Sequence, residues 1–447
     1  MAKVTKLSGF PEWLPEGRIA ELRVLDTARR VFELHGFGSL ETRSVEPVEQ
    51  MQRKGEIDKE VYLLRRMQAA EGESDAGLGL HFDLTVPFAR YVLENAGHLE
   101  FPFRRYQIQK SWRGERPQEG RFREFTQADI DVIDRDALAF HHDVEMAVVM
   151  ATLLAELPIP RAIVQVNNRK LAEGFFTGVG ADDPAAVLRN VDKLDKIGAA
   201  KVAALLVSDA GLSVESADAC LQLAAIRTPD TSFVERVRAL GVRNDLLDEG
   251  LDELAQVVSS ASRHLPGAIV ADLRIARGLD YYTGTVYETQ LVGFESFGSI
   301  ASGGRYDSLA TDGRQSYPGV GISLGVTRLV SALLGRDLVT VSRSVPSAVL
   351  VAVVDEADRP GSDAVAHVLR ARGIPCEVAP RADKFGKQIR HADRRGIPYV
   401  WFPDDAGHSV KDIRSGEQQP ADPASWNPPT EDLYPTVRPT AHLEESP

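Results

Sequence analysis

Two neighbouring segments of this chain alternate polar and apolar side chains with a period of two. In residues 121–134, the small or apolar positions are Thr126, Ala128, Ile130 and Val132. The positions between them are Phe125, Gln127, Asp129 and Asp131. The preceding segment places polar side chains on a single parity, at Arg105, Gln107, Gln109, Ser111 and Arg113. A period of two is typical of a β-strand, so residues 103–132 are predicted to form a long β-hairpin joined through residues 114–120.

The polar face of this hairpin is either the outer face of a sheet or the lining of a site. It combines a planar amide, carboxylates, arginines and an aromatic ring. This mixture favours a site, because ligand pockets use a few converging polar groups to orient what they bind.

Helical periodicity organises much of the remaining chain. An apolar stripe predicts an amphipathic helix over residues 17–36, and residues 142–157 predict another that stops at Pro158. Residues 168–262 are rich in leucine, alanine and aspartate, and we expect them to be a helical insertion between two β-rich segments. The glycines of residues 70–79 predict a loop.

The last hundred residues alternate between strand-like and helix-like segments. The strands are expected at 348–354, 376–378, 399–402 and 410–413, and the helices at 363–372 and 384–395. This order predicts a small α/β domain with a mostly parallel sheet. The segment after Gly416 carries seven prolines and is expected to be extended or loosely packed. The predicted boundaries are 1–335 for the first domain, 336–346 for a linker and 347–447 for the last domain.

Composition narrows the classes of protein that fit. The chain has 447 residues and a net charge of −13. This charge argues against a general nucleic-acid-binding protein. Basic islands at 104–123 and 381–395 suit selective contacts with anions. Two distant cysteines exclude a disulfide framework and fit a reducing cytoplasm. We expect no membrane segment, because no uncharged run approaches the roughly 20 residues that a membrane helix needs.

Residues 277–288 form the segment of the chain that is most informative about function. Arg277, Asp280, Tyr281 and Tyr282 lie beside two glycines in a segment of β-forming residues. A structural strand rarely carries so many hydrogen-bonding side chains. Arginine pairs with phosphate, and tyrosine hydroxyls orient small polar ligands. Together with the hairpin, these residues indicate an enzyme that handles a nucleotide and a small amino acid.

Four segments resemble those of a known family. Residues 103–125 resemble motif 2 of the class II aminoacyl-tRNA synthetases, and residues 319–329 resemble motif 3. Residues 277–288 resemble a segment peculiar to histidyl-tRNA synthetases, and residues 303–307 fit the same family. The resemblance implies an α+β fold: a class II catalytic domain with an antiparallel sheet flanked by helices, a helical insertion, and a C-terminal α/β anticodon-binding domain.

The resemblance also implies a reaction, in which L-histidine is activated with ATP and then transferred to tRNA(His). Mg²⁺ would be bound mainly through the ATP phosphates. Arg113, Arg277 and Gln127 match the catalytic positions. The positions expected to bind ATP are Arg113, Glu115, Arg121, Phe125 and Arg328. The positions expected to bind histidine are Asp83, Thr85, Gln127, Asp131, Arg277, Tyr281, Tyr282 and Tyr306. Arg116, Lys384, Lys387 and Arg390 are expected to contact tRNA.

Some features depart from the family or leave alternatives open. Val45 stands where the first class II motif usually carries a proline at the dimer interface, although a homodimer is still expected. Asp83 and Asp131 stand where many bacterial relatives have glutamate. His141, His142 and Asp143 are not expected to hold a metal. The alternative functions are a catalytically inactive synthetase-like regulatory subunit and a histidine sensor.

Overall fold

The computed structural model describes residues 5–52, 61–66, 77–275, 281–404 and 407–440. The chain divides into two compact units. One comprises Met1–Pro11 and Val24–Ala332, and the other comprises Glu12–Arg23 and Leu333–Pro447.

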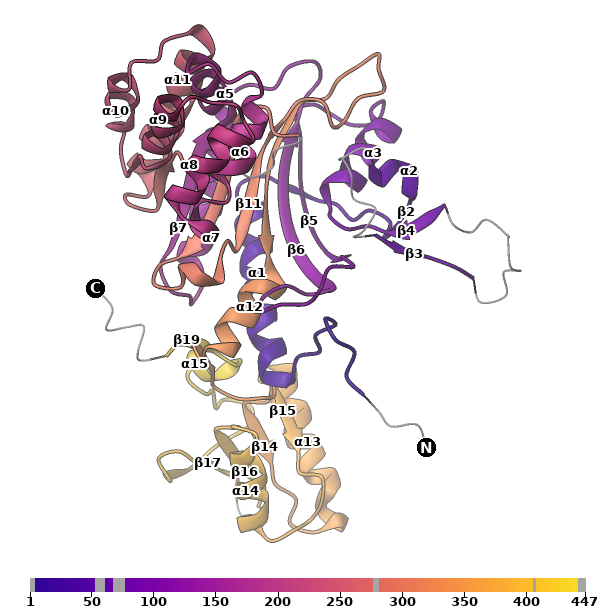
Figure 1. The fold of residues 1–447 in the computed structure, drawn as a ribbon. Coiled ribbons are helices and arrows are strands. Elements are labelled where there is room, and N and C mark those ends of the chain that lie inside the picture. Colours follow the sequence, from indigo (N-terminus) through magenta and orange to yellow (C-terminus); the bar gives the residue numbers. More distant parts are fainter. Residues whose placement is uncertain (1–4, 53–60, 67–76, 276–280, 405–406, 441–447) are drawn as a thin grey trace. The chain divides into compact units, whose positions relative to one another are not determined.

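A nine-stranded sheet forms the centre of the larger unit (Figure 1). In spatial order its strands are β1 (Gly38–Ser39), β5 (Phe103–Trp112), β6 (Glu124–Ile133), β12 (Gly319–Gly325), β11 (Ala301–Tyr306), β10 (Thr285–Leu291), β7 (Ala162–Asn168), β9 (Ile269–Asp272) and β8 (Arg227–Thr228). The run from β5 to β7 is antiparallel, whereas β1 pairs with β5 and β9 pairs with β7 in parallel. The antiparallel sheet expected from the sequence is confirmed.

The predicted hairpin is β5 and β6, with Arg105 opposite Asp131 and Gln107 opposite Asp129. Its two faces are both buried, for different reasons. The apolar face packs on α1 (Pro15–Leu34), where the Phe32 and Tyr106 rings lie 5.9 Å apart. The polar face is covered by α3 (Thr85–Asn95), whose Phe88 ring lies 4.4 Å from the Arg105 guanidinium. The polar face is therefore not an outer sheet face.

Helix α1 begins and ends within two residues of the prediction, and Gly36 follows it with φ +77. Two residues of the expected apolar stripe, Leu22 and Leu34, are nevertheless exposed. Helix α4 (His141–Glu156) is also as expected and packs against β7 and β12.

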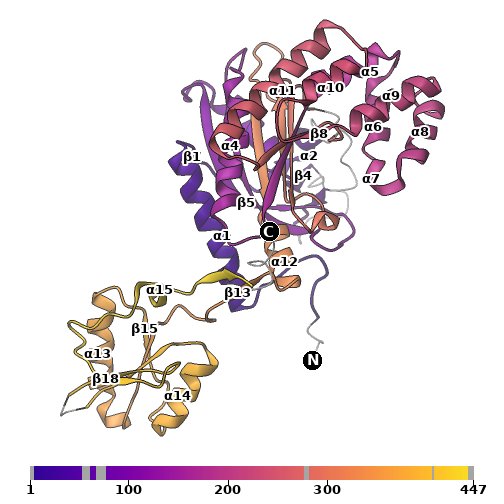
Figure 2. The same ribbon diagram turned by 90° about the vertical axis from the view of Figure 1, so that its left-hand side faces the viewer.

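Seven helices lie between β7 and β9 and gather at one end of the sheet (Figure 2). They are α5 (Arg169–Gly178), α6 (Pro184–Val191), α7 (Leu194–Ile197), α8 (Ala199–Ser208), α9 (Val214–Ala224), α10 (Phe233–Ala239) and α11 (Asp245–His264). Helices α5 and α11 approach closely at Gly250, where an added Cβ would lie 2.2 Å from the Leu171 backbone nitrogen. Glycine is required there because no side chain fits between the helices.

A separate three-stranded sheet has the order β2 (Val45–Pro47), β4 (Leu78–Leu80) and β3 (Tyr62–Leu63), with α2 (Val48–Met51) following β2. Most of the loop expected at 70–79 lies outside the described residues, and its last two positions belong to β4.

The smaller unit contains a five-stranded sheet in the order β15 (Cys376–Val378), β14 (Val349–Val351), β16 (Tyr399–Phe402), β17 (Ser409–Asp412) and β18 (Gln418–Pro420). Helices α13 (Arg359–Ala371) and α14 (Phe385–Arg394) cover its two faces. The pairs of β14 are parallel, but β16–β17 and β17–β18 are antiparallel. The prediction of a mostly parallel sheet is therefore correct only for its centre.

As far as residue 440, the proline-rich segment makes tertiary contacts, so the expectation of loose packing was wrong for this part. The Trp426 ring lies 5.3 Å from Tyr399, and Arg372 donates hydrogen bonds to the carbonyl oxygens of Pro423 and Trp426. Helix α15 (Thr430–Leu433) follows, and β19 (Val437–Pro439) pairs with β13 (Val339–Val341) inside the segment expected to be a linker. Prolines obscured these contacts, because they remove the periodicity on which the prediction depended.

Candidate active site

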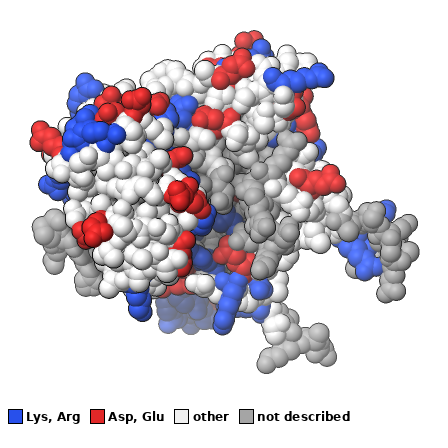
Figure 3. All heavy atoms as spheres, turned by 45° about the horizontal axis from the view of Figure 1, so that its top comes forward, with Lys and Arg blue, Asp and Glu red and all other residues white. Residues whose placement is uncertain are grey.

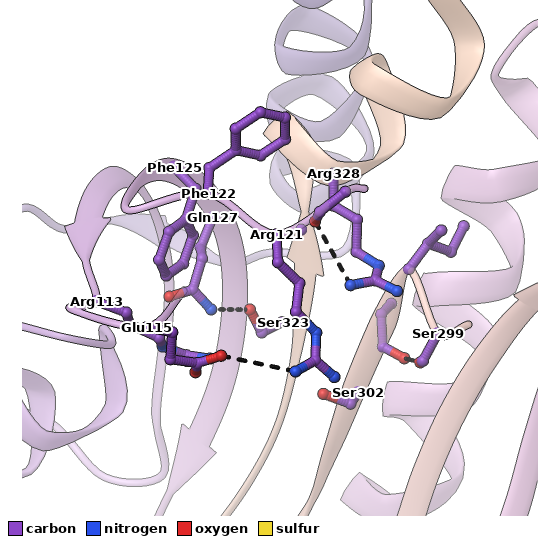
Figure 4. A pocket seen from close by; sticks show the side chains of 14 residues that line it. Arg113, Glu115, Arg121, Phe122, Phe125, Gln127, Ser299, Ser302, Ser323 and Arg328 are labelled. Atoms are coloured by element: carbon purple, nitrogen blue, oxygen red, sulfur yellow. Dashed lines mark hydrogen bonds and ion pairs between the residues drawn. The ribbon is translucent and has the colours of Figure 1, made fainter. Parts of the chain in front are cut away.

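The polar face of β6 borders a cavity of about 270 Å³, called here the arginine cavity (Figure 4). Its lining comes from the β5–β6 hairpin, the approach to β11, and the junction of β12 with α12 (Val326–Gly335). The lining residues are Arg113, Glu115, Gly120, Arg121, Phe122, Phe125, Gln127, Ser299, Ile300, Ala301, Ser302, Ser323, Gly325 and Arg328.

Three cationic side chains converge on the arginine cavity from two distant parts of the chain. Arg113 Nε donates to the Phe82 carbonyl oxygen at 3.0 Å, and its guanidinium lies 5.1 Å from the centre of the Phe125 ring. Arg121 lies 3.6 Å from the Glu115 carboxylate. Arg328, in the first turn of α12, donates to the Phe297 carbonyl oxygen. Excess positive charge around an open cavity suits a polyanion such as a phosphate chain.

A smaller space, called here the tyrosine pocket, adjoins the arginine cavity at Ser302 and Ser323. Its volume is about 20 Å³. The lining residues are Thr85, Asp129, Asp131, Tyr281, Tyr282, Ser302, Gly303, Gly304, Tyr306, Gly321, Ile322 and Ser323.

Asp131 is the best-anchored group of the tyrosine pocket. Its carboxylate accepts a hydrogen bond from the Tyr306 hydroxyl at 2.8 Å and lies 2.7 Å from Arg105 Nη2. Opposite it on β12, an added Cβ at Gly321 would lie 2.1 Å from Asp131 Oδ1. The glycine therefore makes room for the carboxylate. Burial, then the charge of Asp131, raises the pKa of Tyr306, so the phenol stays a hydrogen-bond donor.

The adjacent tyrosines form a second wall of the pocket. The Tyr281 and Tyr282 rings lie 4.2 Å apart, and burial raises the pKa of Tyr281. Thr85 lies at the start of α3, where Asp83 Oδ1 accepts a hydrogen bond from the Val86 backbone at 3.1 Å. The pocket thus combines carboxylates with neutral hydroxyls, which suits a small ligand that donates several hydrogen bonds.

Asp129 lies between Gln127 and Asp131 on the same face of β6. It is buried, and this burial raises the pKa of its carboxyl group to about 7 against the opposing effect of Arg105. Gln127 Nε2 donates to Ser323 Oγ at 2.5 Å. Gln127 lines the arginine cavity, Asp129 and Asp131 line the tyrosine pocket, and Ser323 lines both.

The structure brings most of the sequence-predicted residues together. Arg113, Glu115, Arg121, Phe125, Gln127 and Arg328 line the arginine cavity. Thr85, Asp131, Tyr281, Tyr282 and Tyr306 line the tyrosine pocket. Asp83 precedes Thr85 without being among the lining residues, and Arg277 lies outside the described residues. The lining residues that had not been singled out as candidates include Asp129, Ser302 and Ser323. The parity of β6 could have identified Asp129, because it matches that of Gln127 and Asp131.

The candidate tRNA-contacting residues lie in two places. Arg116 is exposed in the β5–β6 connection and does not line the arginine cavity. Lys387 and Arg390, on α14, line a surface groove together with Arg381 and Arg394. Lys384 is exposed immediately before α14. Basic and acidic side chains are interspersed on the face shown in Figure 3.

The paired histidines belong to a structural network. His142 Nδ1 lies 3.2 Å from Glu145, and Asp143 lies 2.6 Å from Arg305. Within the described residues, no group of three or more His, Cys, Asp or Glu side chains is placed to hold a metal ion. Nor does any helix in that part of the chain have the length and apolar character needed to cross a membrane.

Two family models match this chain. Residues 9–329 match the histidyl-tRNA synthetase family model, and residues 348–421 match an anticodon-binding domain model. The histidine–tRNA ligase of Cutibacterium acnes is 61% identical over 98% of this chain and 99% of its own length. That of Micrococcus luteus is likewise 61% identical over 98% of this chain and 99% of its own length.

Solved structures extend the likeness to the fold. The histidyl-tRNA synthetase of Nostoc sp. PCC 7120 has a TM-score of 0.85 and 34% identity, covering 94% of this chain and 97% of that one. A protein from Bacillus halodurans, described as an ATP phosphoribosyltransferase regulatory subunit/histidyl-tRNA synthetase, has a TM-score of 0.71 over 86% of this chain and 96% of its own. At 20% identity, this second likeness shows the shared fold alone. With a family model that matches residues 9–329 and relatives that are 61% identical over nearly all of its length, the chain belongs to the histidyl-tRNA synthetase family.

Proposed function

We propose that the arginine cavity and the tyrosine pocket together carry out the two steps of histidine–tRNA ligation. In the first step, a carboxylate oxygen of histidine attacks the α-phosphate of ATP and pyrophosphate leaves. In the second, a terminal ribose hydroxyl of tRNA(His) attacks the carbonyl carbon of histidyl-adenylate and AMP leaves. The observation that carries the proposal is the direct junction, at Ser302 and Ser323, of a cation-lined cavity and a carboxylate-lined pocket.

The arginine cavity is the proposed ATP site. The attacking carboxylate is already ionised at neutral pH, so the first step needs alignment and charge neutralisation rather than a strong base. Arg113 and Arg277 are assigned to the α-phosphate, and Arg328 to the γ-phosphate. Adenine would stack on Phe125, with Glu115 and Arg121 beside the nucleotide.

Mg²⁺ is assigned to the ATP phosphates, where it would neutralise charge. The lining of the arginine cavity offers one carboxylate for such an ion, Glu115, and it already lies 3.6 Å from Arg121. A single paired carboxylate fits an ion held mainly by its nucleotide, since Mg²⁺ commonly binds through one or two carboxylates plus substrate phosphates.

The tyrosine pocket is the proposed histidine site. Asp131, Tyr281, Tyr282 and Tyr306 would surround the imidazole ring, whose two nitrogens require partners at a fixed spacing. Asp83, Thr85 and Gln127 are assigned to the α-ammonium group, and Gln127 also positions the reacting carboxylate. A wrong amino acid would leave these buried groups unpaired, which can discriminate by about 10⁴–10⁵.

The remaining assignments concern the domains, the contacts with tRNA and the oligomeric state. Residues 1–335 are proposed as the catalytic domain with a helical insertion at 168–262, and residues 347–447 as the domain that contacts the anticodon region of tRNA(His). Arg116, Lys384, Lys387 and Arg390 are assigned to phosphate contacts. The enzyme is proposed to work in the cytoplasm as a homodimer.

Amino-acid-dependent exchange of pyrophosphate into ATP tests the function, measured with each of the twenty amino acids in turn. Histidine alone is expected to support exchange. Absence of exchange from a well-folded sample that binds histidine would favour a regulatory subunit or a histidine sensor. Exchange supported by a different amino acid would contradict the assignment of the tyrosine pocket.

A further inference from the structure

Gln127 presents one end of its amide to a serine and leaves the other end buried at the site. Nε2 donates to Ser323 Oγ at 2.5 Å. Oε1 is buried, accepts no hydrogen bond from the described residues, and points away from Ser323 (Figure 4). An amide in this orientation offers an acceptor to a ligand, whereas the flipped amide would offer donors.

Ser323 alone does not determine which way the amide points. A hydroxyl group has one hydrogen to donate and can also accept. If the Ser323 hydrogen were free, it could be donated to Oε1 of a flipped Gln127. The flipped amide would then present its NH₂ group to an ammonium ion, which has donors only.

Asp129 faces Ser323 across the β6–β12 pair. Its Oδ1 is buried and accepts no hydrogen bond from the described residues, so this oxygen is placed to take the hydrogen of the Ser323 hydroxyl and remove that freedom. With its hydrogen committed to Asp129, Ser323 can only accept from Gln127, so Nε2 must face the serine. Hydrogen bonds would then run from the Gln127 amide to the Ser323 hydroxyl and on to the Asp129 carboxylate.

We propose that Asp129 is a positioning residue that acts through Ser323 to hold the Gln127 carbonyl oxygen toward the α-ammonium group of histidine. The inference rests on the proposed function, in which Gln127 contacts that group. It assigns to Asp129 a role in substrate affinity that is exerted through Ser323.

The charge around Asp129 makes this arrangement sensitive to pH. The charged groups that face it are Arg105 of β5, Asp131 of β6 and Asp83 before α3. Burial, then the two carboxylates, raises its pKa to about 7 despite Arg105 and the Ser323 hydroxyl. Below that pH, protonated Asp129 can donate to Ser323, which frees the serine to donate to a flipped amide. Histidine affinity should therefore weaken as pH falls from 8 to 6.

The test is pyrophosphate exchange with Asp129→Ala, Ser323→Ala and the double variant. Each single change is expected to raise the KM for histidine about tenfold, the scale of one hydrogen bond to a charged group, while the KM for ATP stays unchanged. Because both residues act through one chain of hydrogen bonds, the double variant should be no worse than either single one. Multiplying losses, or an unchanged KM for histidine, would overturn the proposal.

Two further variants distinguish a positioning role of Asp129 from a general loss of protein stability. Asp129→Asn keeps an acceptor oxygen and should hold the KM for histidine within about threefold of the wild type. In this variant the KM for histidine should also lose the pH dependence that Asp129 contributes. This contribution is measured after correction for the titration of free histidine itself. An Asn variant as poor as Ala would overturn the proposal. The control Asp432→Asn breaks an ion pair with Arg414 in the smaller unit and is expected to lower Tm without changing the KM for histidine.

Gln127→Ala distinguishes failure of the proposed function from failure of the positioning role of Asp129. If it leaves the KM for histidine unchanged, the proposed contact with the ammonium group is wrong. If it raises this KM while Asp129→Ala and Ser323→Ala do not, the proposed function stands and the positioning role falls.

Discussion

The arginine cavity and the tyrosine pocket share a sheet face but recognise their ligands by opposite means. In the cavity, side chains keep access to solvent; those of Arg121 and Glu115 are 48% and 31% exposed. In the pocket, the Asp131 side chain is 4% exposed, and that of its ion-pair partner Arg105, which is not among the lining residues, is 0% exposed. The cavity can accommodate a flexible polyanion at little cost. The pocket holds buried charged groups before any ligand binds, which is costly unless their geometry is exact. The same buried groups make the binding of a wrong ligand unfavourable.

The largest effect is expected in the pocket. Asp131→Ala leaves Arg105 buried without its carboxylate and removes the acceptor of Tyr306, so stability should fall by about 3–5 kcal/mol. Histidine-dependent exchange should fall about 10³-fold or more. Replacing Arg105 and Asp131 together by leucine should recover stability in urea denaturation but not activity. Full activity of that double variant would show that the ion pair serves the fold alone.

In the cavity, Arg113→Ala should lower kcat for histidine activation by about 10²–10³, the scale for losing one group that stabilises transition-state charge. Arg277→Ala is expected to have the same effect. For Arg113→Ala the KM for histidine should change little, because Arg113 is not among the residues that line the tyrosine pocket. Exposed Arg29, which pairs with Asp26 on α1, supplies the control variant Arg29→Ala. A near-normal rate for Arg113→Ala would refute its assignment to the α-phosphate.

Phe125→Ala should separate the two regions most cleanly. Loss of stacking costs roughly 1–3 kcal/mol, so the KM for ATP should rise by about tenfold to a hundredfold. The KM for histidine, measured at saturating ATP, should stay the same. Equal changes in both constants would mean that the cavity and the pocket are not independent.

Contacts on α14 should have a smaller effect on a different step. Lys387→Ala with Arg390→Ala is expected to weaken tRNA charging several-fold and to reduce the salt dependence of tRNA binding by one to two phosphate contacts. Pyrophosphate exchange, which needs no tRNA, is the internal control and should be unaffected. Impaired exchange would contradict the assignment of α14 to tRNA alone.

The last expected effect is the pH-dependent stability cost of the carboxylate-rich pocket. Asp129 titrates near pH 7 in the folded chain and near its ordinary value of 3.8 when unfolded. As pH rises through this window, the unfolded chain loses the proton first, so stability falls until about pH 7. Asp129→Asn should therefore have a Tm a few degrees above the wild type at pH 8, and the gap should close below about pH 4. A gap that is independent of pH would contradict the raised pKa.

Sequence reasoning succeeded where the alternation of polar and apolar residues matched the two different environments on the two faces of a sheet. The hairpin register followed from alternation, because a slip of one residue would move Asp131 and Gln127 to the apolar face. Arg113 and Arg328 were found through motifs, although their convergence required the sheet. The Asp129–Ser323 contact could not be predicted, because the pairing of β6 with β12 joins segments almost two hundred residues apart.

The predictions that failed concern segments whose residues show no periodic pattern of polar and apolar side chains. The segment after Gly416 packs through single anchors, such as Trp426 on Tyr399, that show no repeating pattern. Strand β13 is three residues long and is recognisable only through its partner β19. Short edge pairings of this kind depend on tertiary context rather than on the intrinsic preferences of their residues.

A crystal structure with a non-hydrolysable analogue of histidyl-adenylate would show whether the arginine cavity and the tyrosine pocket hold the two halves of one ligand. We expect the adenine ring on Phe125, the phosphate substitute beside Arg113, and the imidazole ring between Asp131 and the paired tyrosines. We also expect Gln127 Oε1 to face the α-ammonium group. An analogue bound with its imidazole in the arginine cavity, or outside both spaces, would contradict this assignment of the two spaces.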